Sequence, residues 1–208
     1  MKKIHPTAII DSKAEILDNV EVGAYSVIDS AVTIGAGTKI LNHVSVTGNT
    51  TLGSGNTIFP FSVIGTAPQD ISYRGEPTSL IIGDRNVIRE NCTLNVGTVR
   101  GKALTEIGSD NLIMAYSHIA HDSTLGDHII FANGASLAGH VEVGDFAILG
   151  GFTLVHQFCR VGPHSLTGIG TVCLQDVAPY LIVAGSPTKT YGINVRGLRR
   201  RDFGDEVI

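Results

Sequence analysis

An aliphatic residue recurs at every sixth position over most of this 208-residue chain. The first run has no gap and comprises Ile4, Ile10, Ile16, Val22, Ile28, Ile34, Ile40, Val46, Leu52, Ile58 and Ile64. An α-helix has about 3.6 residues per turn and a strand alternates with a period of about two, so neither produces this spacing. A fixed short repeat is instead typical of solenoids, in which each unit buries its apolar side chain against its neighbours.

Small residues occupy the other recurrent positions of the repeat. A small or β-branched residue generally stands four positions after each aliphatic, and glycine often follows the aliphatic directly, as in Ile34-Gly35 and Leu52-Gly53. Glycine allows a sharp backbone turn because it has no Cβ. We therefore predict short parallel strands joined at tight corners, with three hexads in each coil of 18 residues and coils about 4.8 Å apart.

The repeat continues through the second half of the chain. It resumes at Ile82, Ile88 and Leu94, and then runs from Ile107 to Val161 at intervals of six. We predict an all-β fold, a parallel β-helix of about eight coils over residues 1–178. Residues 179–208 are expected to form a basic cap or the start of a shortened helical extension.

Two stretches interrupt the repeat. Residues 66–81 keep the 18-residue phase but carry polar residues such as Gln69 and Asp70, and across residues 95–106 the spacing from Leu94 to Ile107 is one residue longer than two hexads. Loops on a rigid framework often carry function, so both are candidate walls of a binding site.

Composition excludes several classes of protein. There are 15 basic and 19 acidic residues, a net charge of −4, which gives no indication of a nucleic-acid partner. No apolar run approaches the roughly 20 residues of a membrane helix, and we expect a cytoplasmic protein without a transmembrane segment. The three cysteines show neither a paired spacing nor a disulfide framework.

The basic residues gather near the end of the chain. Five of the 15 lie in the tail, namely Lys189, Arg196, Arg199, Arg200 and Arg201. The tail is expected to cover the open end of the solenoid, where unpaired strand edges need protection. It could also meet an acidic partner or a phosphate.

The coil length predicts which polar residues lie together. Residues 18 apart stack in columns, which are His121 with Gly139 and Gln157, Asp122 with His140 and Phe158, and Ala120 with Ala138 and His156. With His118 nearby, four histidines and a carboxylate are expected near one corner.

Two chemistries could use this cluster. In acyl transfer, a neutral imidazole takes a proton from an attacking hydroxyl, and the Gly139 N–H is placed to stabilise the oxyanion. In metal catalysis, three histidines would hold Zn²⁺ with one position open. No serine or cysteine nucleophile stands out in the cluster, which favours direct transfer over a covalent enzyme intermediate.

Longer motifs cover the chain almost from end to end. They are Ile64-Gly65 with Pro68-Gln69-Asp70, Tyr73-x-Gly75-Glu76-Pro77-Thr78, Ile82-Gly83-Asp84-Arg85-Asn86, Gly108-Ser109-Asp110-Asn111, His118-Ile119-Ala120-His121-Asp122, Leu137-Ala138-Gly139-His140-Val141, Val155-His156-Gln157-Phe158-Cys159 and Asn194-x2-Gly197-Leu198-x-Arg200-Arg201. In these motifs and their order the sequence resembles the UDP-N-acetylglucosamine acyltransferases that begin lipid A synthesis.

The resemblance implies a left-handed β-helix and a homotrimer with active sites between subunits. It implies transfer of an (R)-3-hydroxyacyl chain from acyl carrier protein to the 3-hydroxyl of UDP-N-acetylglucosamine, without a cofactor or a metal. By motif, His121 is the general base, Asp122 orients it and Gly139 supplies the oxyanion donor. The residues implied to bind the sugar nucleotide or the acyl product are Gln69, Asp70, His118, His140, His156, Gln157, Asn194 and Arg200.

The sequence departs from the family pattern at several places. Relatives commonly have lysine where Ser72 stands, so we expect Arg74 or Arg85 to compensate, and some have glutamate at the position of Arg196. We assign the acyl-length pocket to Ile169 and Leu166. Ile169 replaces a glycine of the best-known relatives, which predicts a shorter accepted chain.

The family usually continues into a C-terminal helical domain that helps engage the carrier protein, whereas this sequence stops at Ile208. Either the chain is a shortened form, or it is a compact relative that docks the carrier through residues 196–201 and neighbouring coils.

Other functions stay open at this point. A zinc lyase built on a trimeric β-helix would need a pair of histidines five positions apart, which the sequence lacks. A related acyltransferase with an amino-sugar acceptor is a second alternative. A non-catalytic β-helix that binds a nucleotide sugar is a third.

Overall fold

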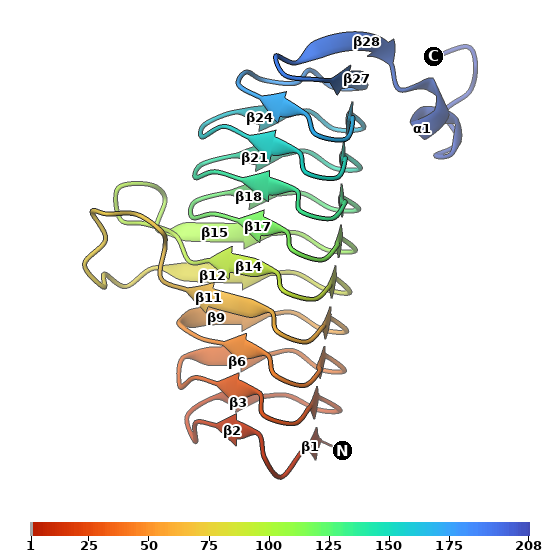
Figure 1. Cartoon of the computed structure of the whole chain (residues 1–208). Helices are drawn as coiled ribbons and strands as arrows, with labels where there is room; N and C mark the ends of the chain where they lie inside the picture. Colours follow the sequence, from red (N-terminus) through yellow and green to blue (C-terminus); the bar gives the residue numbers. More distant parts are fainter. Residues whose placement is uncertain (1) are drawn as a thin grey trace.

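The computed structural model describes residues 2–208 and shows three parallel sheets wound into a prism (Figure 1). Sheet A consists of β1 (Lys3–Ile4), β4 (Glu21–Val22), β7 (Lys39–Ile40), β10 (Thr57–Ile58), β13 (Val87–Ile88), β16 (Leu112–Ile113), β19 (Ile130–Phe131), β22 (Ile148–Leu149), β25 (Leu166–Thr167), β27 (Leu181–Ala184) and β28 (Lys189–Ile193). Sheet B consists of β2 (Ile9–Ile10), β5 (Val27–Ile28), β8 (Ser45–Val46), β11 (Val63–Thr66), β14 (Thr93–Asn95), β17 (His118–Ile119), β20 (Ser136–Leu137), β23 (Leu154–Val155) and β26 (Val172–Cys173). Sheet C consists of β3 (Glu15–Ile16), β6 (Val32–Ile34), β9 (Asn49–Leu52), β12 (Ser79–Ile82), β15 (Leu104–Ile107), β18 (Thr124–Leu125), β21 (Glu142–Val143) and β24 (Arg160–Val161).

Each coil takes one strand from each sheet in turn. Strands β1 to β24 make eight complete coils, and β25 and β26 begin a ninth. Strand β27 continues sheet A, and β28 returns antiparallel to it across the end of the solenoid. The predicted parallel β-helix and its coil number are therefore confirmed.

The aliphatic residues of the hexads fill the interior of the prism. Ile28, Ile34, Ile40 and their successors are almost completely buried in one continuous core. The buried small positions are often polar and bond to the neighbouring coils: the amide N–H groups of Asn86 and Asn111 donate to the side-chain oxygens of Asn56 and Asn86, respectively. A buried polar group is stable only with such a partner.

The two interruptions are insertions, and the first changes the predicted phase. Register partners across it are 30 residues apart, as with Asn56 and Asn86, so 12 residues are inserted and Ile82 lies in sheet C above Leu52. The expected 18-residue phase was wrong because 12 is two whole hexads, which leaves the spacing intact but moves the next strand to another face. Across the second insertion the partners Asn86 and Asn111 are 25 apart, so seven residues are added.

Both insertions leave the solenoid at the same corner. The first connects β11 to β12 and the second connects β14 to β15, which are successive crossings from sheet B to sheet C. They project together from one side of the prism (Figure 1). The next crossing above them is the turn that carries His121 and Asp122.

The outer faces of the sheets differ in character. Sheet A carries an outward column of aliphatic residues in register, which are Val87, Leu112, Ile130, Ile148, Leu166 and Ile182. The corresponding column of sheet C is polar or charged at most positions, with Thr33, Thr51, Glu106, Thr124, Glu142 and Arg160. An apolar stripe of this length is unusual on a surface that faces water.

The C-terminal segment folds back along the corner between sheets C and A. Helix α1 (Val195–Arg199) begins at Asn194, whose side chain accepts from Gly197 N–H and donates to the carbonyl of His164. The guanidinium of Arg201 donates to the carbonyl of Phe146 and lies over its ring. Residues 194–201 are therefore tied to the body of the solenoid. No helix within residues 2–208 has the length and hydropathy needed to cross a membrane.

Candidate active site

His121 and Asp122 form the turn between β17 and β18. The Nδ1 atom of His121 lies 2.8 Å from Oδ2 of Asp122, whose side chain is fully buried. The backbone N–H of Asp122 donates to Thr105 Oγ1 at 2.8 Å, and Asp122 has a φ of 60°. An aspartate tolerates this left-handed conformation better than most residues. A carboxylate at Nδ1 favours the tautomer that leaves Nε2 free to accept a proton.

The second insertion encloses the Asp122 carboxylate. The N–H and Oγ1 of Thr98 and the N–H of Lys102 all donate to it, at 2.7 to 3.1 Å. Gly101 packs so closely that a Cβ there would stand 2.4 Å from the carboxyl carbon. The loop therefore fixes Asp122, and through it His121.

These contacts keep Asp122 ionised. Burial alone would raise its pKa, but the hydrogen bonds from Thr98 and His121 outweigh burial and hold the pKa below its ordinary value of 3.8. Nearby His140 acts in the same direction. A fixed negative charge beside His121 stabilises the imidazolium that forms when His121 takes a proton.

His140 lies beside the pair. Its ring stacks on Phe158 with centroids 4.5 Å apart and meets the His121 ring edge-on at 5.1 Å. Burial lowers the pKa of His140, against the pull of Asp122, and so favours its neutral form. A neutral imidazole can both donate and accept hydrogen bonds, which suits recognition of hydroxyl groups.

Gly139 lies against the imidazole of His121, as the column prediction required. A Cβ on Gly139 would stand 2.5 Å from Cε1 and 2.7 Å from Nε2 of His121. Within residues 2–208, the Gly139 N–H has no hydrogen-bond acceptor. This N–H is therefore available to a ligand that reaches the free nitrogen of His121.

A cavity of about 620 Å³ opens above these groups. Its lining residues come from both insertions and from three successive turns, and they are Gln69, Asp70, Ile71, Thr98, Arg100, Gly101, His121, His140, Gln157 and Phe158. A groove of about 690 Å³ on the outer face of sheet C is larger but is lined by no histidine. The larger of the two volumes is therefore not the one that holds His121 and His140.

The remaining predicted site residues lie elsewhere on the chain. His118 is on the outer side of β17 with its Nδ1 2.7 Å from Thr93 Oγ1, and burial lowers its pKa. His156 is exposed and points its Nδ1 at the carbonyl of Gln157. Neither lines the cavity around His121. Of the four histidines expected together, the cavity joins two.

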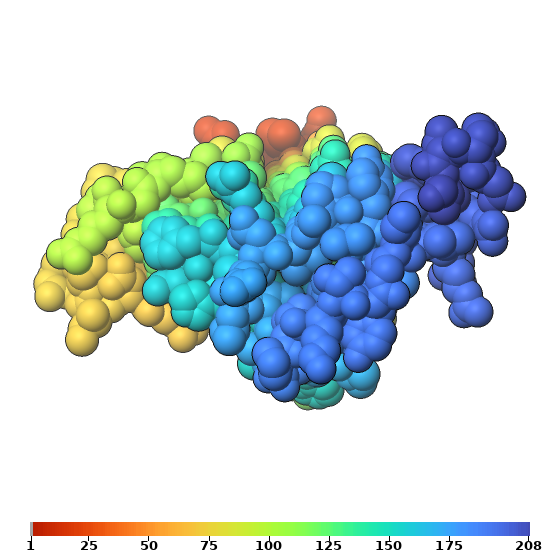
Figure 2. Space-filling model, turned by 90° about the horizontal axis from the view of Figure 1, so that it is seen from above, coloured from red at the N-terminus to blue at the C-terminus, as the bar shows by residue number. Residues whose placement is uncertain are grey.

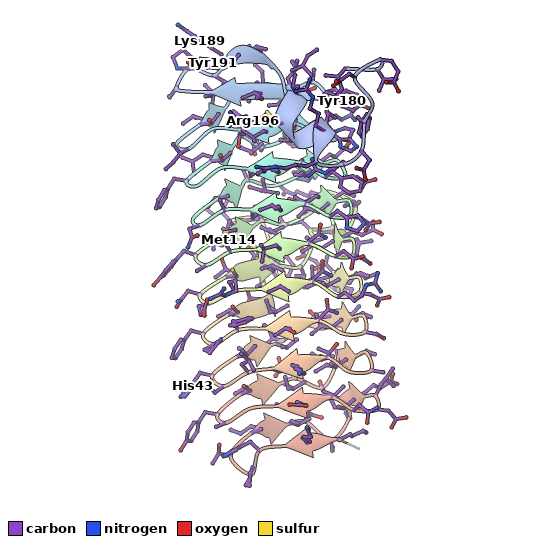
Figure 3. The ribbon with its side chains drawn as sticks, turned by 90° about the vertical axis from the view of Figure 1, so that its right-hand side faces the viewer. His43, Met114, Tyr180, Lys189, Tyr191 and Arg196 are labelled. Carbon is purple, nitrogen blue, oxygen red and sulfur yellow. The ribbon has the colours of Figure 1, made fainter. Side chains whose placement is uncertain are left out.

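Asn194, Arg200 and Leu166 line a second cavity, of about 410 Å³, on the outer face of sheet A. Its other walls include Ile148 and Arg196. Figure 2 shows the insertions and the C-terminal segment on opposite sides of the molecule, and Figure 3 shows Arg196, a residue of α1, at the C-terminal end. Ile169 lies in the turn after β25 and is 80% exposed.

Neither arginine expected to compensate for Ser72 is free. Ser72 itself donates to Asp70 through its N–H and its hydroxyl, at 2.8 and 2.9 Å. Arg74 donates to the carbonyls of Ile71 and Tyr73 within its own loop. Arg85 makes two bonds of 2.7 Å to Asp110, on the corner between sheets C and A. The expectation that Arg74 or Arg85 serves the site is therefore not supported.

His121, Asp122 and His140 lie close enough to share a metal ion. The Asp122 oxygens, however, already accept from two backbone N–H groups, a hydroxyl and His121. Binding a metal through them would sacrifice those bonds. The donor set fits a base held by a carboxylate better than it fits a metal site.

The chain is similar to known proteins over its whole length. Residues 104–139 match the family described as bacterial transferase hexapeptide repeats, and residues 176–208 match domain 2 of UDP-N-acetylglucosamine O-acyltransferase. The chain is 56% identical, over its full length, to the acyl-[acyl-carrier-protein]–UDP-N-acetylglucosamine O-acyltransferases of Herminiimonas arsenicoxydans and Thiobacillus denitrificans, covering 79% and 81% of those proteins. The chain belongs to this acyltransferase family.

Solved structures of the family show the same fold. LpxA from Acinetobacter baumannii superposes with a TM-score of 0.97 at 48% identity, over 99% of this chain and 80% of that one. The acyltransferase of Francisella novicida gives 0.96 at 40% identity, over 98% and 75%. These matches confirm the left-handed β-helix that the resemblance implied.

The sequence did not reveal how Asp122 is held. Thr98 and the N–H of Lys102 bind it across 24 and 20 positions of the chain, respectively. The only signal was the glycine-rich character of the insertion, since Gly97 and Gly101 allow close approach of the backbone.

The contact from Thr98 predicts a pH-dependent change in stability. Because the folded-state pKa of Asp122 lies below 3.8, its contribution is present at neutral pH and is lost as the pH falls through the folded pKa. Thr98→Val removes a hydroxyl that donates to this anion, which should cost about 1.5–3 kcal/mol at neutral pH.

Urea unfolding at a fixed protein concentration and a series of pH values measures the free energy of unfolding of wild type and Thr98→Val. The difference in the free energy of unfolding between wild type and Thr98→Val should become smaller as the pH falls through the acidic range. Thr51→Val, an exposed change on the outer face of sheet C, is the control and should show no such gap. If the two free energies of unfolding differed by the same amount at every pH, the stabilisation by Thr98 would not depend on the charge of Asp122.

Proposed function

We propose that the chain transfers an (R)-3-hydroxyacyl group from acyl carrier protein to the 3-hydroxyl of UDP-N-acetylglucosamine, the first step of lipid A synthesis. The observation that carries this proposal is the arrangement of His121 between a buried carboxylate and the unbonded N–H of Gly139. The names of the relatives state the same two substrates.

The proposed reaction is a direct transfer. Nε2 of His121 takes the proton of the sugar hydroxyl while the hydroxyl oxygen attacks the thioester carbonyl. Negative charge develops on the carbonyl oxygen, and the Gly139 N–H donates to it. The intermediate then collapses, the C–S bond breaks, and the imidazolium returns its proton to the leaving thiolate.

The walls of the cavity suit a sugar nucleotide. Gln69, Gln157 and His140 offer donors and acceptors for sugar hydroxyls, and Asp70 offers a carboxylate whose pKa is lowered mainly by hydrogen bonds from Ser72. Ile71 and Phe158 add exposed apolar surface on which an acyl chain can lie. His118 and His156 flank this region from sheet B and its turn.

We further propose a homotrimer. The aliphatic column on sheet A needs a covering surface, and the second cavity, with Asn194 and Arg200, lies on that same face. Packing of this face against a neighbouring subunit would explain how two residues remote from His121 in one chain serve a site shared between chains.

Ile130→Glu tests the trimer because it places a charge in the middle of that column. Burying an unpaired carboxylate in an interface is strongly unfavourable, so the variant should sediment as a monomer. Analytical ultracentrifugation measures this. Thr33→Glu on sheet C is the matched control and should remain trimeric. A wild type that is monomeric at all concentrations would contradict the proposal.

Ile169 and Leu166 are proposed to limit the length of the acyl chain. Ile169→Gly should move the preference toward longer chains, with an increase of about 10-fold or more for two added methylenes, because each buried methylene contributes about 0.8 kcal/mol. Rates with carrier thioesters of increasing length measure the shift. Leu17→Gly, an exposed change near the N-terminus, should leave the preference unchanged. An unchanged preference in Ile169→Gly would remove Ile169 from the pocket.

The acceptor is tested by product analysis. The purified protein is incubated with acyl carrier thioesters and, in separate reactions, UDP-N-acetylglucosamine or its 3-amino analogue, and products are identified by mass spectrometry. The proposal predicts an alkali-labile ester on UDP-N-acetylglucosamine. Faster formation of an amide on the amino analogue would assign the other acceptor, and no product from either would favour the non-catalytic alternative.

A further inference from the structure

Arg100 stands at the tip of the turn that encloses Asp122. The residue two positions before it, Thr98, and the residue two positions after it, Lys102, both donate their N–H groups to the Asp122 carboxylate. The Gly101 N–H also bonds to Thr98. The backbone that carries Arg100 is therefore fixed relative to His121, although the Arg100 side chain is exposed.

Arg100 is the one lysine or arginine among the described residues that line the cavity around His121. Its guanidinium forms no ion pair and no hydrogen bond within residues 2–208. By contrast, the side chain of Lys102 is bonded to Thr124 and that of Arg74 to carbonyls of its own loop. Of these three basic side chains, that of Arg100 is thus the one without a partner among the described residues.

The charge of Arg100 acts on carboxylates of the first insertion, which forms another wall of the cavity. It helps to lower the pKa values of Asp70 and Glu76, both in the first insertion, although hydrogen bonds contribute most to both shifts. An anionic ligand in the cavity would lie beside Asp70 and be repelled by it. A cation at the same mouth offsets that repulsion, and Arg100 supplies it.

We propose that Arg100 binds a substrate phosphate at the mouth of the cavity and so sets substrate affinity at the His121 site. This inference rests on the proposed function. Both proposed substrates carry such a group, the diphosphate of the sugar nucleotide and the phosphodiester of the carrier's phosphopantetheine arm. A guanidinium matches phosphate oxygens with two parallel hydrogen bonds, which an ammonium group cannot do.

Arg100→Gln, Arg100→Lys and Arg89→Gln are compared with the wild type. Arg89 is also an exposed arginine, on a corner away from the cavity and paired with Glu90, and serves as the control. Arg100→Gln should raise the KM of one substrate by about 10-fold to 100-fold, as expected for loss of a charged hydrogen bond. The kcat should stay within about 2-fold, Arg100→Lys should recover part of the affinity, and Arg89→Gln should resemble the wild type.

Two sets of measurements identify which substrate phosphate Arg100 binds. If it is the diphosphate, Arg100→Gln weakens calorimetric binding of UDP and raises the KM of the sugar nucleotide. If it belongs to the carrier arm, the variant loses the wild type's preference for a phosphopantetheine thioester over a pantetheine thioester and binds free phosphopantetheine less tightly.

The measurements of UDP and phosphopantetheine binding need no turnover, so they test the role of Arg100 even if no acyl transfer is observed. Transfer by the wild type is measured first, and its absence would count against the proposed function. Unchanged binding of both UDP and phosphopantetheine in Arg100→Gln, with unchanged KM values, would overturn the role of Arg100 alone.

Discussion

His121→Ala is expected to lower the rate of acyl transfer by about 10² to 10⁴-fold, the usual contribution of a positioned general base. The side chain of His121 is largely buried, but its partner Asp122 keeps its bonds to Thr98 and Lys102 in the variant. The fold should therefore persist, and affinity for UDP-N-acetylglucosamine should change little. Steady-state kinetics and calorimetric binding measure the two quantities separately.

His43→Ala is the control for this experiment. His43 is exposed on the corner between sheets A and B and lies toward the N-terminal end (Figure 3). Its removal costs a contact with the rings of Tyr25 and Phe61 and a side-chain hydrogen bond to Asn42, all outside the cavity around His121. His43→Ala should retain full activity. Equal rates in His121→Ala and wild type would show that His121 is not the base.

Gly139→Ala is expected to reduce the rate by about 10²-fold or more. The new methyl would stand 2.5 Å from the His121 ring, so the imidazole must move away from its position. A displacement of about 1 Å in a catalytic group commonly costs 10²-fold, and misplacing an oxyanion donor costs about 10² to 10³-fold.

Gly151→Ala is the matched change, since the nearest atom to its Cβ would be 3.5 Å away. It lies two turns along the chain, between β22 and β23, and should leave the rate nearly unchanged. Melting temperatures of both variants separate misfolding from misplacement. A folded Gly139→Ala protein with wild-type kinetics would mean that neither the ring position nor the oxyanion geometry depends on Gly139.

The sequence was sufficient to predict the coils and the stacking of the reactive residues. A period of six determines which side chains point inward, and 18-residue coils placed Gly139 against His121 and Phe158 against His140. These predictions succeeded because the turns of these coils contain no insertion. In a solenoid, sequence separation then converts directly into distance.

The insertions show where that conversion fails. Twelve added residues preserve the hexad spacing but move Ile82 to another sheet, so the spacing alone could not reveal the change of face. The clamp on Asp122 depends largely on backbone N–H groups, such as that of Lys102, which every sequence contains. The separation of Asn194 and Arg200 from His121 follows from the path of a tail that has no repeat.

The most direct test of the central claim is rapid quenching of a reaction between the acyl carrier thioester, UDP-N-acetylglucosamine and this chain, with the masses of sugar nucleotide and chain measured in each sample. Direct transfer assisted by His121 predicts that the acyl group appears on the sugar nucleotide while the mass of the chain never changes. An acylated chain that forms and decays at the rate of turnover would contradict the account.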